Sequence, residues 1–587
     1  LCDRRQRQMC IRDRFYLCGK YICCLMVEEN FIKIYEKSFK ENWDLPALTD
    51  YNTRETFTYG DMARQIARIH LLLQHCQIRR GDKIALIGRN TPRWVMSFFA
   101  TVTYGAIIVP ILQDFNPNDV HHIINHSDAV LLFSGSLAWE HIEMEKLNQV
   151  RGVISLDDYS CLDQRDGEDI MQYLADIDQH FEKTYPDGFS RNDIKYAELG
   201  NDKVSLINYT SGTTGFSKGV MLTGNNLAGN TCFGMQSKLH YKGSKCLSFL
   251  PLAHAYGCAF DLLTPLAVGT HVTLLGKIPS PKILLKAMEE VKPNLIICVP
   301  LILEKIYRKQ ILPMLNKRTM RWALSLPVLD SRIYGQVCKK LVDAFGGRFE
   351  QVIVGGAPLN AEVEAFLHKI KFPFTVGYGM TECAPLISYT HWKEFIPRSS
   401  GRILPGYMEV KIDSTDPQLI PGEICVRGEN VMKGYYKNEE ATADVLKDGW
   451  LHTGDMGTVS EDGTIFIKGR YKTMILGANG QNIYPEEIES KLNNMPFVME
   501  SLVIEKEGKL VALVYPDFEA VDTYGLTPED LPVAMEEVRR NLNKEVAPYE
   551  SIAHIYIYQS EFEKTPKRSI KRYLYTNFTP LPDKKEK

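Results

Sequence analysis

Long apolar runs are missing from this sequence of 587 residues. No eighteen consecutive apolar residues occur, whereas a helix that spans a bilayer needs about twenty, so no spanning helix is expected. Peripheral contact with a membrane is left open.

An excess of positive charge is also missing, because the chain has 69 lysines and arginines and 72 aspartates and glutamates, for a net charge of −3. This balance gives no general attraction to nucleic acid, and no nucleic-acid partner is expected.

Closely spaced cysteine pairs are missing from most of the chain. Of the 14 cysteines, the following are scattered and form no C-x-x-C motif: Cys76, Cys161, Cys232, Cys246, Cys258, Cys298, Cys338, Cys383 and Cys425. This pattern favours buried free thiols in a reducing compartment, and a cytoplasmic location is predicted.

The first 25 residues differ in composition from the rest of the chain. They hold the other cysteines among clustered arginines, at Cys2, Cys10, Cys18, Cys23 and Cys24. A short apolar stretch follows, but no small-residue cleavage site comes after it, which argues against a signal peptide. We therefore expect residues 1–25 to be a non-native or disordered segment and the native chain to begin at Met26.

The remaining length is too great for one ordinary domain. Buried strand patterns alternate with helical patterns up to about residue 400, which is typical of a parallel α/β core. Short alternating strands then indicate a small β-rich subdomain. We predict an α/β fold with a large N-terminal domain of several subdomains, residues 26–470. A small mobile α+β domain is predicted for residues 471–587.

The segment 209–219 reads Tyr-Thr-Ser-Gly-Thr-Thr-Gly-Phe-Ser-Lys-Gly. Glycines let backbone N–H groups turn inward, hydroxyls add donors, and Lys218 adds a positive charge, which together suit a polyphosphate. The flanks 204–209 and 220–222 read as strands, and Thr223 is a candidate helix cap. The spacing is not the Walker pattern. The alternative is a flexible surface loop.

Two further segments agree with a nucleotide site. Gly355-Gly356-Ala357-Pro358 follows the strand pattern 352–354, where small residues let a flat base approach the backbone. The alternative is a plain β-turn. In 378–382, Tyr-Gly-Met-Thr-Glu, the tyrosine offers a flat face for the base, the threonine a hydroxyl for phosphate and the glutamate an oxygen ligand for Mg²⁺. A lone glutamate is more often only solvated.

Three single residues complete this set. Asp455 ends the segment 449–455 and suits both ribose hydroxyls, although an Asx-turn residue is the alternative. Arg470 is placed to reinforce the same ribose. His254, in the apolar segment 251–256, is a candidate for orienting a carboxylate; a satisfied core histidine is the commoner case.

In their order, the segments 209–219, 378–382, 453–455 and 468–470 resemble the adenylate-forming superfamily of acyl-CoA synthetases, luciferases and adenylation domains. The resemblance extends from about Met26 to Leu574. The segments 249–256, 299–307 and 480–487 look most like the long-chain fatty acyl-CoA synthetases.

The resemblance implies two half-reactions. A carboxylate attacks the α-phosphate of ATP to give acyl-AMP and pyrophosphate, and the thiol of coenzyme A then attacks the acyl-AMP after the C-terminal domain rotates. Mg²⁺ is implied on Glu382, and Lys472 falls at the hinge. The residues expected to bind the nucleotide are Thr210, Ser211, Gly212, Thr213, Thr214, Gly215, Lys218, Gly355, Gly356, Ala357, Tyr378, Gly379, Thr381, Asp455, Arg470 and Lys472. Those expected to act in catalysis are Lys218, His254, Thr381, Glu382, Lys567 and Lys571.

One position departs from the family pattern. The family has a catalytic lysine in a segment Thr-Pro-x-x-Lys-x-x-Arg, and here its place is taken by Ser569. In an extended segment Lys567 and Lys571 would point the same way as Ser569, each about 6–7 Å from it. We expect one of them to supply the missing charge. The alternative is a basic run that contacts only coenzyme A phosphates or solvent.

The leading interpretation is an ATP-dependent long-chain fatty acid–CoA ligase, with ATP, Mg²⁺ and coenzyme A as cofactors and a fatty acid as substrate. One alternative passes the acyl group to another acceptor, such as acyl carrier protein. A second alternative is a non-catalytic nucleotide-binding homologue, which only Ser569 supports.

Overall fold

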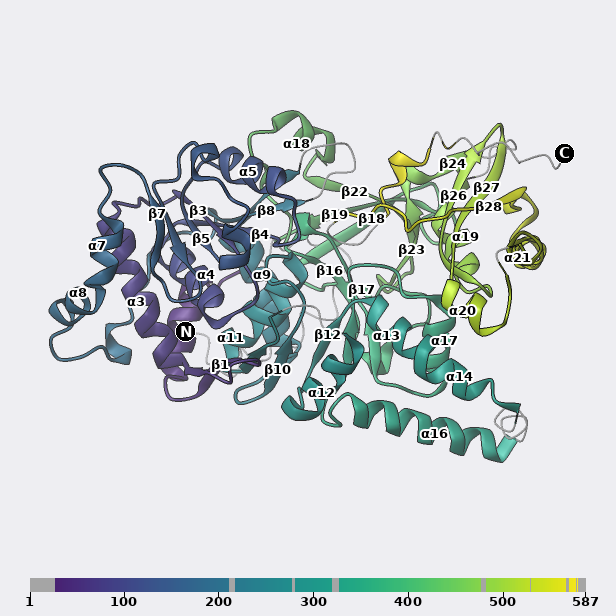
Figure 1. Cartoon of the computed structure of the whole chain (residues 1–587), viewed down its shortest axis with the longest axis horizontal. Helices are drawn as coiled ribbons and strands as arrows, with labels where there is room; N and C mark the ends of the chain where they lie inside the picture. Colours follow the sequence, from purple (N-terminus) through teal and green to yellow (C-terminus); the bar gives the residue numbers. More distant parts are fainter. Residues whose placement is uncertain are drawn as a thin grey trace, which may run out of the picture.

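The computed structural model describes residues 27–210, 217–276, 280–318, 327–476, 482–527, 529–565, 570–576 and 578. The expectations for residues 1–25 and for the start at Met26 lie outside this part of the chain. A large lobe is coloured purple through teal to green, and a smaller yellow-green to yellow lobe lies beside it (Figure 1). One hydrophobic core extends from Phe31 to Ile465, and two others lie between Ile483 and Tyr575.

An eight-stranded sheet is the largest in the molecule. Its strands are, in spatial order, β20(Gly434–Tyr435), β9(Lys218–Thr223), β8(Val204–Thr210), β4(Ile107–Ile111), β3(Lys83–Ile87), β5(Ala129–Ser134), β6(Gly152–Ser155) and β7(Cys161–Gln164). The central strands β8, β4, β3, β5 and β6 pair in parallel, and helices follow several of them along the chain. The predicted parallel α/β layer is thereby confirmed.

Two other sheets of the large lobe are built around parallel pairs, although β1 and β2 pair antiparallel. The first has the order β10(Lys245–Ser248), β11(His271–Leu274), β1(Pro46–Asp50) and β2(Thr56–Thr58). The second has the order β12(Ile296–Cys298), β13(Val352–Val354) and β14(Phe374–Val376). Because Cys298, Val354 and Val376 are in register, the loops after these three strands leave the same edge of the sheet.

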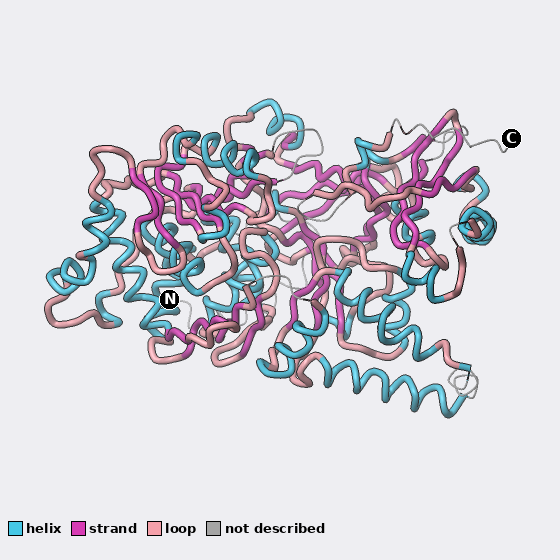
Figure 2. The backbone as a smooth tube through the Cα atoms, viewed as in Figure 1, coloured by secondary structure: helices cyan, strands magenta, loops and turns pink. Residues whose placement is uncertain are grey.

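The part of the large lobe near residue 400 is rich in antiparallel strands (Figure 2). One small sheet contains β15(Tyr378–Gly379), β16(Leu386–Tyr389) and β17(Arg402–Ile403). The other contains β18(Met408–Asp413), β19(Gly422–Gly428), β22(Trp450–Val459), β21(Leu446–Lys447) and, paired with β22, β23(Ile465–Arg470). This agrees with the β-rich subdomain that the sequence predicts.

The smaller lobe holds a mixed sheet of β26(Val498–Lys506), β27(Lys509–Pro516) and β28(His554–Ile557), preceded by the hairpin β24(Ile475–Leu476) and β25(Asn482–Ile483). Its helices are α19(Pro485–Leu492), α20(Phe518–Thr523) and α21(Leu531–Glu545). The sheet and helices enclose their own cores. The lobe is therefore α+β, as predicted.

The α-helices of the large lobe connect and cover its sheets. They are α2(Phe31–Glu41), α3(Tyr59–His75), α4(Pro92–Tyr104), α5(Pro117–His126), α6(Ser136–Trp139), α7(Ile170–Ala175), α8(Ile177–Thr184), α9(Gly224–Gln236), α10(Ala255–Gly257), α11(Thr264–Val268), α12(Pro281–Val291), α13(Pro300–Ile306), α14(Leu312–Leu315), α16(Pro327–Ala344), α17(Ala361–Lys369) and α18(Glu439–Val445). In the part of the chain that is described, no helix is both long and apolar enough to cross a membrane.

Local sequence signals explain where several elements begin. Thr223 caps α9, with its side chain accepting a hydrogen bond from Asn226 N, as predicted. Asn360 likewise accepts from the first amides of α17, and Pro485 is the first residue of α19. The nine scattered cysteines are free, as expected, but Cys161 and Cys338 are only partly buried.

Aromatic rings fill the core of the large lobe. Phe99 lies 4.8 Å from Tyr35 and 5.5 Å from Phe39, measured between ring centroids. All three side chains are fully buried. Rings packed in this way contribute stability beyond the area that they bury.

Phe99→Ala should lower the free energy of unfolding of the large lobe by about 3–5 kcal/mol, because it leaves a cavity among these rings. Phe99→Leu keeps most of the volume and should cost less than half as much. Urea unfolding followed by tryptophan fluorescence measures both. Equal midpoints for the parent and Phe99→Ala would contradict this account of the core.

Candidate active site

A cavity of about 2800 Å³ is lined by residues of both lobes. The described residues that the sequence predicts for the site all line it, except Lys571. They are Thr210, Lys218, His254, Gly355, Gly356, Ala357, Tyr378, Gly379, Thr381, Glu382, Asp455, Arg470 and Lys472. Segments more than 200 residues apart in sequence thus contribute to one space.

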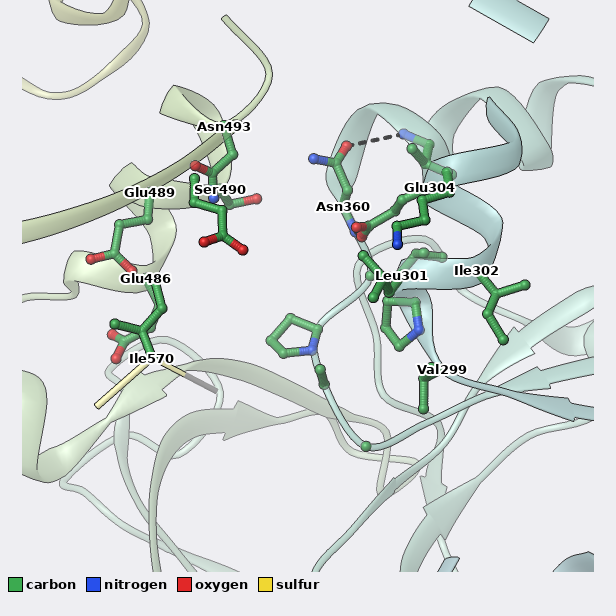
Figure 3. Close-up of a pocket in the computed structure, with 18 of the residues that line it drawn as sticks. Val299, Leu301, Ile302, Glu304, Asn360, Glu486, Glu489, Ser490, Asn493 and Ile570 are labelled. Atoms are coloured by element: carbon green, nitrogen blue, oxygen red, sulfur yellow. Dashed lines mark hydrogen bonds between the residues drawn. The ribbon is translucent and has the colours of Figure 1, made fainter. Parts of the chain in front are cut away.

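Side chains of the two lobes face each other across this cavity (Figure 3). Glu486 and Glu489 of α19 lie on one side, and Val299 and Leu301 from the loop after β12 and the start of α13 lie on the other. The loops that leave the common edge of β12, β13 and β14 therefore form the large lobe's wall. This is the edge at which open α/β sheets place their ligands.

Asp455 is a buried acid that lines the cavity. It lies opposite Arg470, which is on the neighbouring strand β23. The Nε atom of Arg470 is 2.8 Å from Asp455 Oδ1. Tyr378 donates its hydroxyl hydrogen to Asp455 Oδ2 at 2.7 Å. A carboxylate accepts about four hydrogen bonds, so acceptor positions remain for a ligand's hydroxyls.

Burial and charge act in opposite directions on Asp455. Burial raises its pKa, and the positive charge of Arg470 and the hydrogen bond from Tyr378 lower it again. Glu382 and Glu486 are the nearby acids that raise it further. Asp455 in turn raises the pKa of Arg470. On balance the pKa of Asp455 lies above its usual value because of burial, and the ion pair with Arg470 limits that rise.

Lys218, Tyr435 and Glu382 form a second polar group. The Lys218 ammonium lies 4.9 Å from the centroid of the Tyr435 ring, and the Tyr435 hydroxyl donates to Glu382 Oε1 at 2.9 Å. The other acceptor positions of Glu382 leave room for a divalent cation that also binds phosphate oxygens, so the residues fit Mg²⁺. Sequence reasoning missed Tyr435, which reaches the site because β20 pairs with β9.

The glycine turn after β13 is held by an aromatic ring. A Cβ on Gly355 would lie 3.0 Å from Cζ of Tyr256, whose hydroxyl donates to Ile353 O at 3.0 Å. Gly356 has a φ of +86°, a conformation that favours glycine. At the end of β15, a Cβ on Gly379 would lie 2.3 Å from Pro385 O. Both positions thus need glycine where the backbone borders the cavity.

His254 is positioned at the start of α10. Its Nδ1 accepts a hydrogen bond from Tyr256 N at 3.3 Å, and the side chain is partly exposed at the cavity wall. This position differs from that of a histidine satisfied inside a core. Its location suits a role in orienting a bound group.

Lys472 and Lys571 lie at different distances from the cavity. Lys472 lies between β23 and β24, where the chain passes from the large to the small lobe. Lys571 Nζ lies 3.5 Å from Glu563 and does not line the cavity in this arrangement. Several predicted residues lie outside the described part of the chain: Ser211, Gly212, Thr213, Thr214, Gly215, Lys567 and Ser569.

Comparison with known proteins gives the following matches. The profile of the AMP-binding enzyme family matches residues 35–436. The long-chain-fatty-acid–CoA ligase FadD15 of Mycobacterium bovis is 27% identical over 569 residues, 88% of this chain and 89% of that protein. A feruloyl-CoA synthase of an Amycolatopsis species is 30% identical over 454 residues, 76% of this chain and 80% of that protein. ATP-bound MatB from Rhodopseudomonas palustris has the same fold, with a TM-score of 0.73, 22% identity and coverage of 94% and 99%.

Arg470→Gln removes the charge that opposes burial at Asp455, so the pKa of Asp455 should rise further. Protonation removes acceptor capacity, so affinity for AMP should fall as pH drops through that pKa, and the fall should begin at higher pH in the variant. Near neutral pH we expect about tenfold weaker binding, or roughly 1.4 kcal/mol. Calorimetric titration of AMP across pH measures both effects.

A matched control is Arg402→Gln, which breaks an arginine–aspartate pair with Asp462 away from Asp455. Its pH profile for AMP should match that of the parent. If Arg470→Gln and Arg402→Gln gave the same profile, the assigned role of Arg470 would be wrong.

Proposed function

The chain belongs to the family of AMP-binding enzymes, and from this premise we propose that it is an ATP-dependent long-chain fatty acid–CoA ligase. The observation that carries the proposal is the convergence of Lys218, Glu382, Asp455 and Arg470 on one cavity. These side chains offer the acceptors for a ribose and the charges for a polyphosphate and its cation. The similarity to a fatty acid–CoA ligase and a feruloyl-CoA synthase supports the same reaction class.

In the first half-reaction, an oxygen of the substrate carboxylate would attack the α-phosphorus of ATP. The bond to the β-phosphate oxygen breaks, and acyl-AMP and pyrophosphate form. Lys218 and the loop 209–219 would hold the phosphates, and Asp455 with Arg470 would hold the ribose. Mg²⁺ on Glu382 would supply positive charge beside the phosphates. Positioning and cations carry the rate of such a transfer.

The choice of a fatty acid rests on the apolar part of the cavity. Pockets for one small ligand are usually about 300–1,000 Å³, whereas this cavity is about 2800 Å³. It therefore has room for a nucleotide and a hydrocarbon chain together. Its apolar lining includes Leu239, Phe260, Leu284, Ile297, Val299 and Ile353.

The second half-reaction needs a changed arrangement of the small lobe. The thiol of coenzyme A would attack the acyl-AMP carbonyl and release AMP. Because the two lobes have separate cores, joined through the segment that holds Lys472, rotation of the small lobe about this segment would leave both cores intact. One cavity would then serve both steps in turn.

Fatty-acid-dependent release of pyrophosphate tests the proposal. With ATP and Mg²⁺, long-chain saturated acids should give faster release than short-chain acids or ferulate, and coenzyme A should be converted to a thioester. No release with any carboxylate would favour the non-catalytic alternative. Release without any thioester product would favour another acceptor, such as acyl carrier protein.

The lysine near Ser569 can be identified by mutation. Loss of the charge that acts at the α-phosphate should slow acyl-AMP formation by about 10²–10³, as for other donors of this kind. We expect this loss in Lys571→Ala or Lys567→Ala, measured in single-turnover assays. Lys571 would have to leave Glu563 when the small lobe moves.

Lys544→Ala is the matched control, because Lys544 is an exposed lysine on α21 of the same lobe. Its rate should equal that of the parent. If the double variant Lys567→Ala, Lys571→Ala also formed acyl-AMP at the parental rate, neither lysine would have the proposed role, and the basic run would serve only coenzyme A or solvent.

A further inference from the structure

A cluster of three metal-ligating side chains lies on the strands β19 and β22. Glu423 and Cys425 are two residues apart on β19 and so project from the same face of the sheet. His452 is directly opposite Cys425 in the register with β22. Asp455 has its side chain in the cavity, and Glu423, Cys425 and His452 are absent from the cavity lining. The cluster is therefore separate from the site described above.

The donor atoms of the cluster converge. Cys425 Sγ lies 3.5 Å from His452 Nδ1, and His452 Nδ1 lies 2.7 Å from Glu423 Oε2. One sulfur, one nitrogen and one oxygen thus lie within 4.8 Å of one another. Tetrahedral zinc with ordinary bond lengths holds such donors about 3.3–3.6 Å apart. The sulfur–nitrogen distance already fits, and the flexible Glu423 side chain needs to retreat by less than about 1 Å.

A backbone hydrogen bond helps to hold the donor atoms of the cluster in place. Gly454 donates its N–H to Glu423 Oε1 at 3.0 Å, which fixes the carboxylate while Oε2 faces the histidine. Such outer hydrogen bonds orient ligands in known metal sites. Glu423 and His452 each expose 23% of their side chains, so an ion has a path from solvent, whereas Cys425 is fully buried beneath them.

The positive charges near the cluster have other partners. Lys411 is opposite Cys425 on β18, but its ammonium lies 4.7 Å from the centroid of the Trp450 ring. Arg427 pairs with Glu409 and also lies over Trp450. Neither Lys411 nor Arg427 therefore forms an ion pair with Glu423, whose carboxylate instead contacts His452 within the cluster.

We propose that Glu423, Cys425 and His452 bind a zinc ion, with water as the fourth ligand. Zinc accepts oxygen, nitrogen and sulfur ligands together, whereas Mg²⁺ and Ca²⁺ prefer oxygen alone. Binding would release the thiol proton of Cys425 to solvent and shift the imidazole proton of His452 from Nδ1 to Nε2. The ion would link β19 to β22 without contacting the substrates.

Titration of the chelator-treated full chain with Co²⁺ and then Zn²⁺ tests the proposal. Co²⁺ should give a thiolate-to-cobalt absorption band, and Zn²⁺ should abolish it. Cys425→Ser should lose this band and bind one equivalent of metal fewer than the parent. His452→Gln and Glu423→Gln should weaken zinc binding at least about tenfold.

Cys161→Ser is the matched control, because Cys161 is another free cysteine on a strand, far from the cluster in sequence. It should bind Co²⁺ like the parent. Circular dichroism checks that each variant is folded, and Glu423→Gln keeps the shape of the parent side chain. If folded Glu423→Gln and Cys425→Ser bound both metals as the parent does, or the parent gave no cobalt band, the cluster would be a hydrogen-bonded group only.

Discussion

The burial of Asp455 is the constraint on which the site depends. A buried carboxylate is costly unless charges and hydrogen bonds compensate for the lost water. Arg470 and Tyr378 supply that compensation from β23 and β15, so one acid ties three strands together. Arg470 is also the last residue before the short helix that holds Lys472. The same contact that compensates the buried acid thus also holds the end of the strand from which the small lobe departs.

The large lobe's wall of the cavity depends on glycines that let the backbone lie close to neighbouring groups. The parallel register of β12, β13 and β14 brings three loops to one edge, and side chains there would fill the space that a ligand needs. At Gly355 the limit is the Tyr256 ring, and at Gly379 it is the Pro385 carbonyl. The ring can shift a little, but the carbonyl belongs to the backbone and cannot. Gly379 on β15 therefore tolerates substitution less than Gly355.

The sequence predicted those parts of the molecule that local signals specify. Thr223 was recognisable as a cap because a cap needs only the residues next to it. Gly355 could be placed after a strand for the same reason. The contacts of Tyr435 depend on the pairing of β20 with β9, and those of Tyr256 depend on the placement of α10 beside β13. No local pattern encodes either. The order of the motifs carried the family resemblance, and that resemblance placed the distant segments in one predicted site. Periodicity alone predicts only helices and strands.

The strand β22 contributes residues both to the cavity and to the cluster of Glu423, Cys425 and His452. Thr453 and Asp455 are buried, and Asp455 lines the cavity, whereas His452 and Gly454 are partly exposed and form hydrogen bonds with Glu423. An ion bound to that cluster would hold the strand through residues adjacent to Asp455. Any resulting change in nucleotide affinity must appear by the same factor in the affinity for the ion, because coupling between two binding sites is reciprocal. If the strand is already rigid through Arg470 and Tyr378, this factor is close to one and the ion contributes only stability.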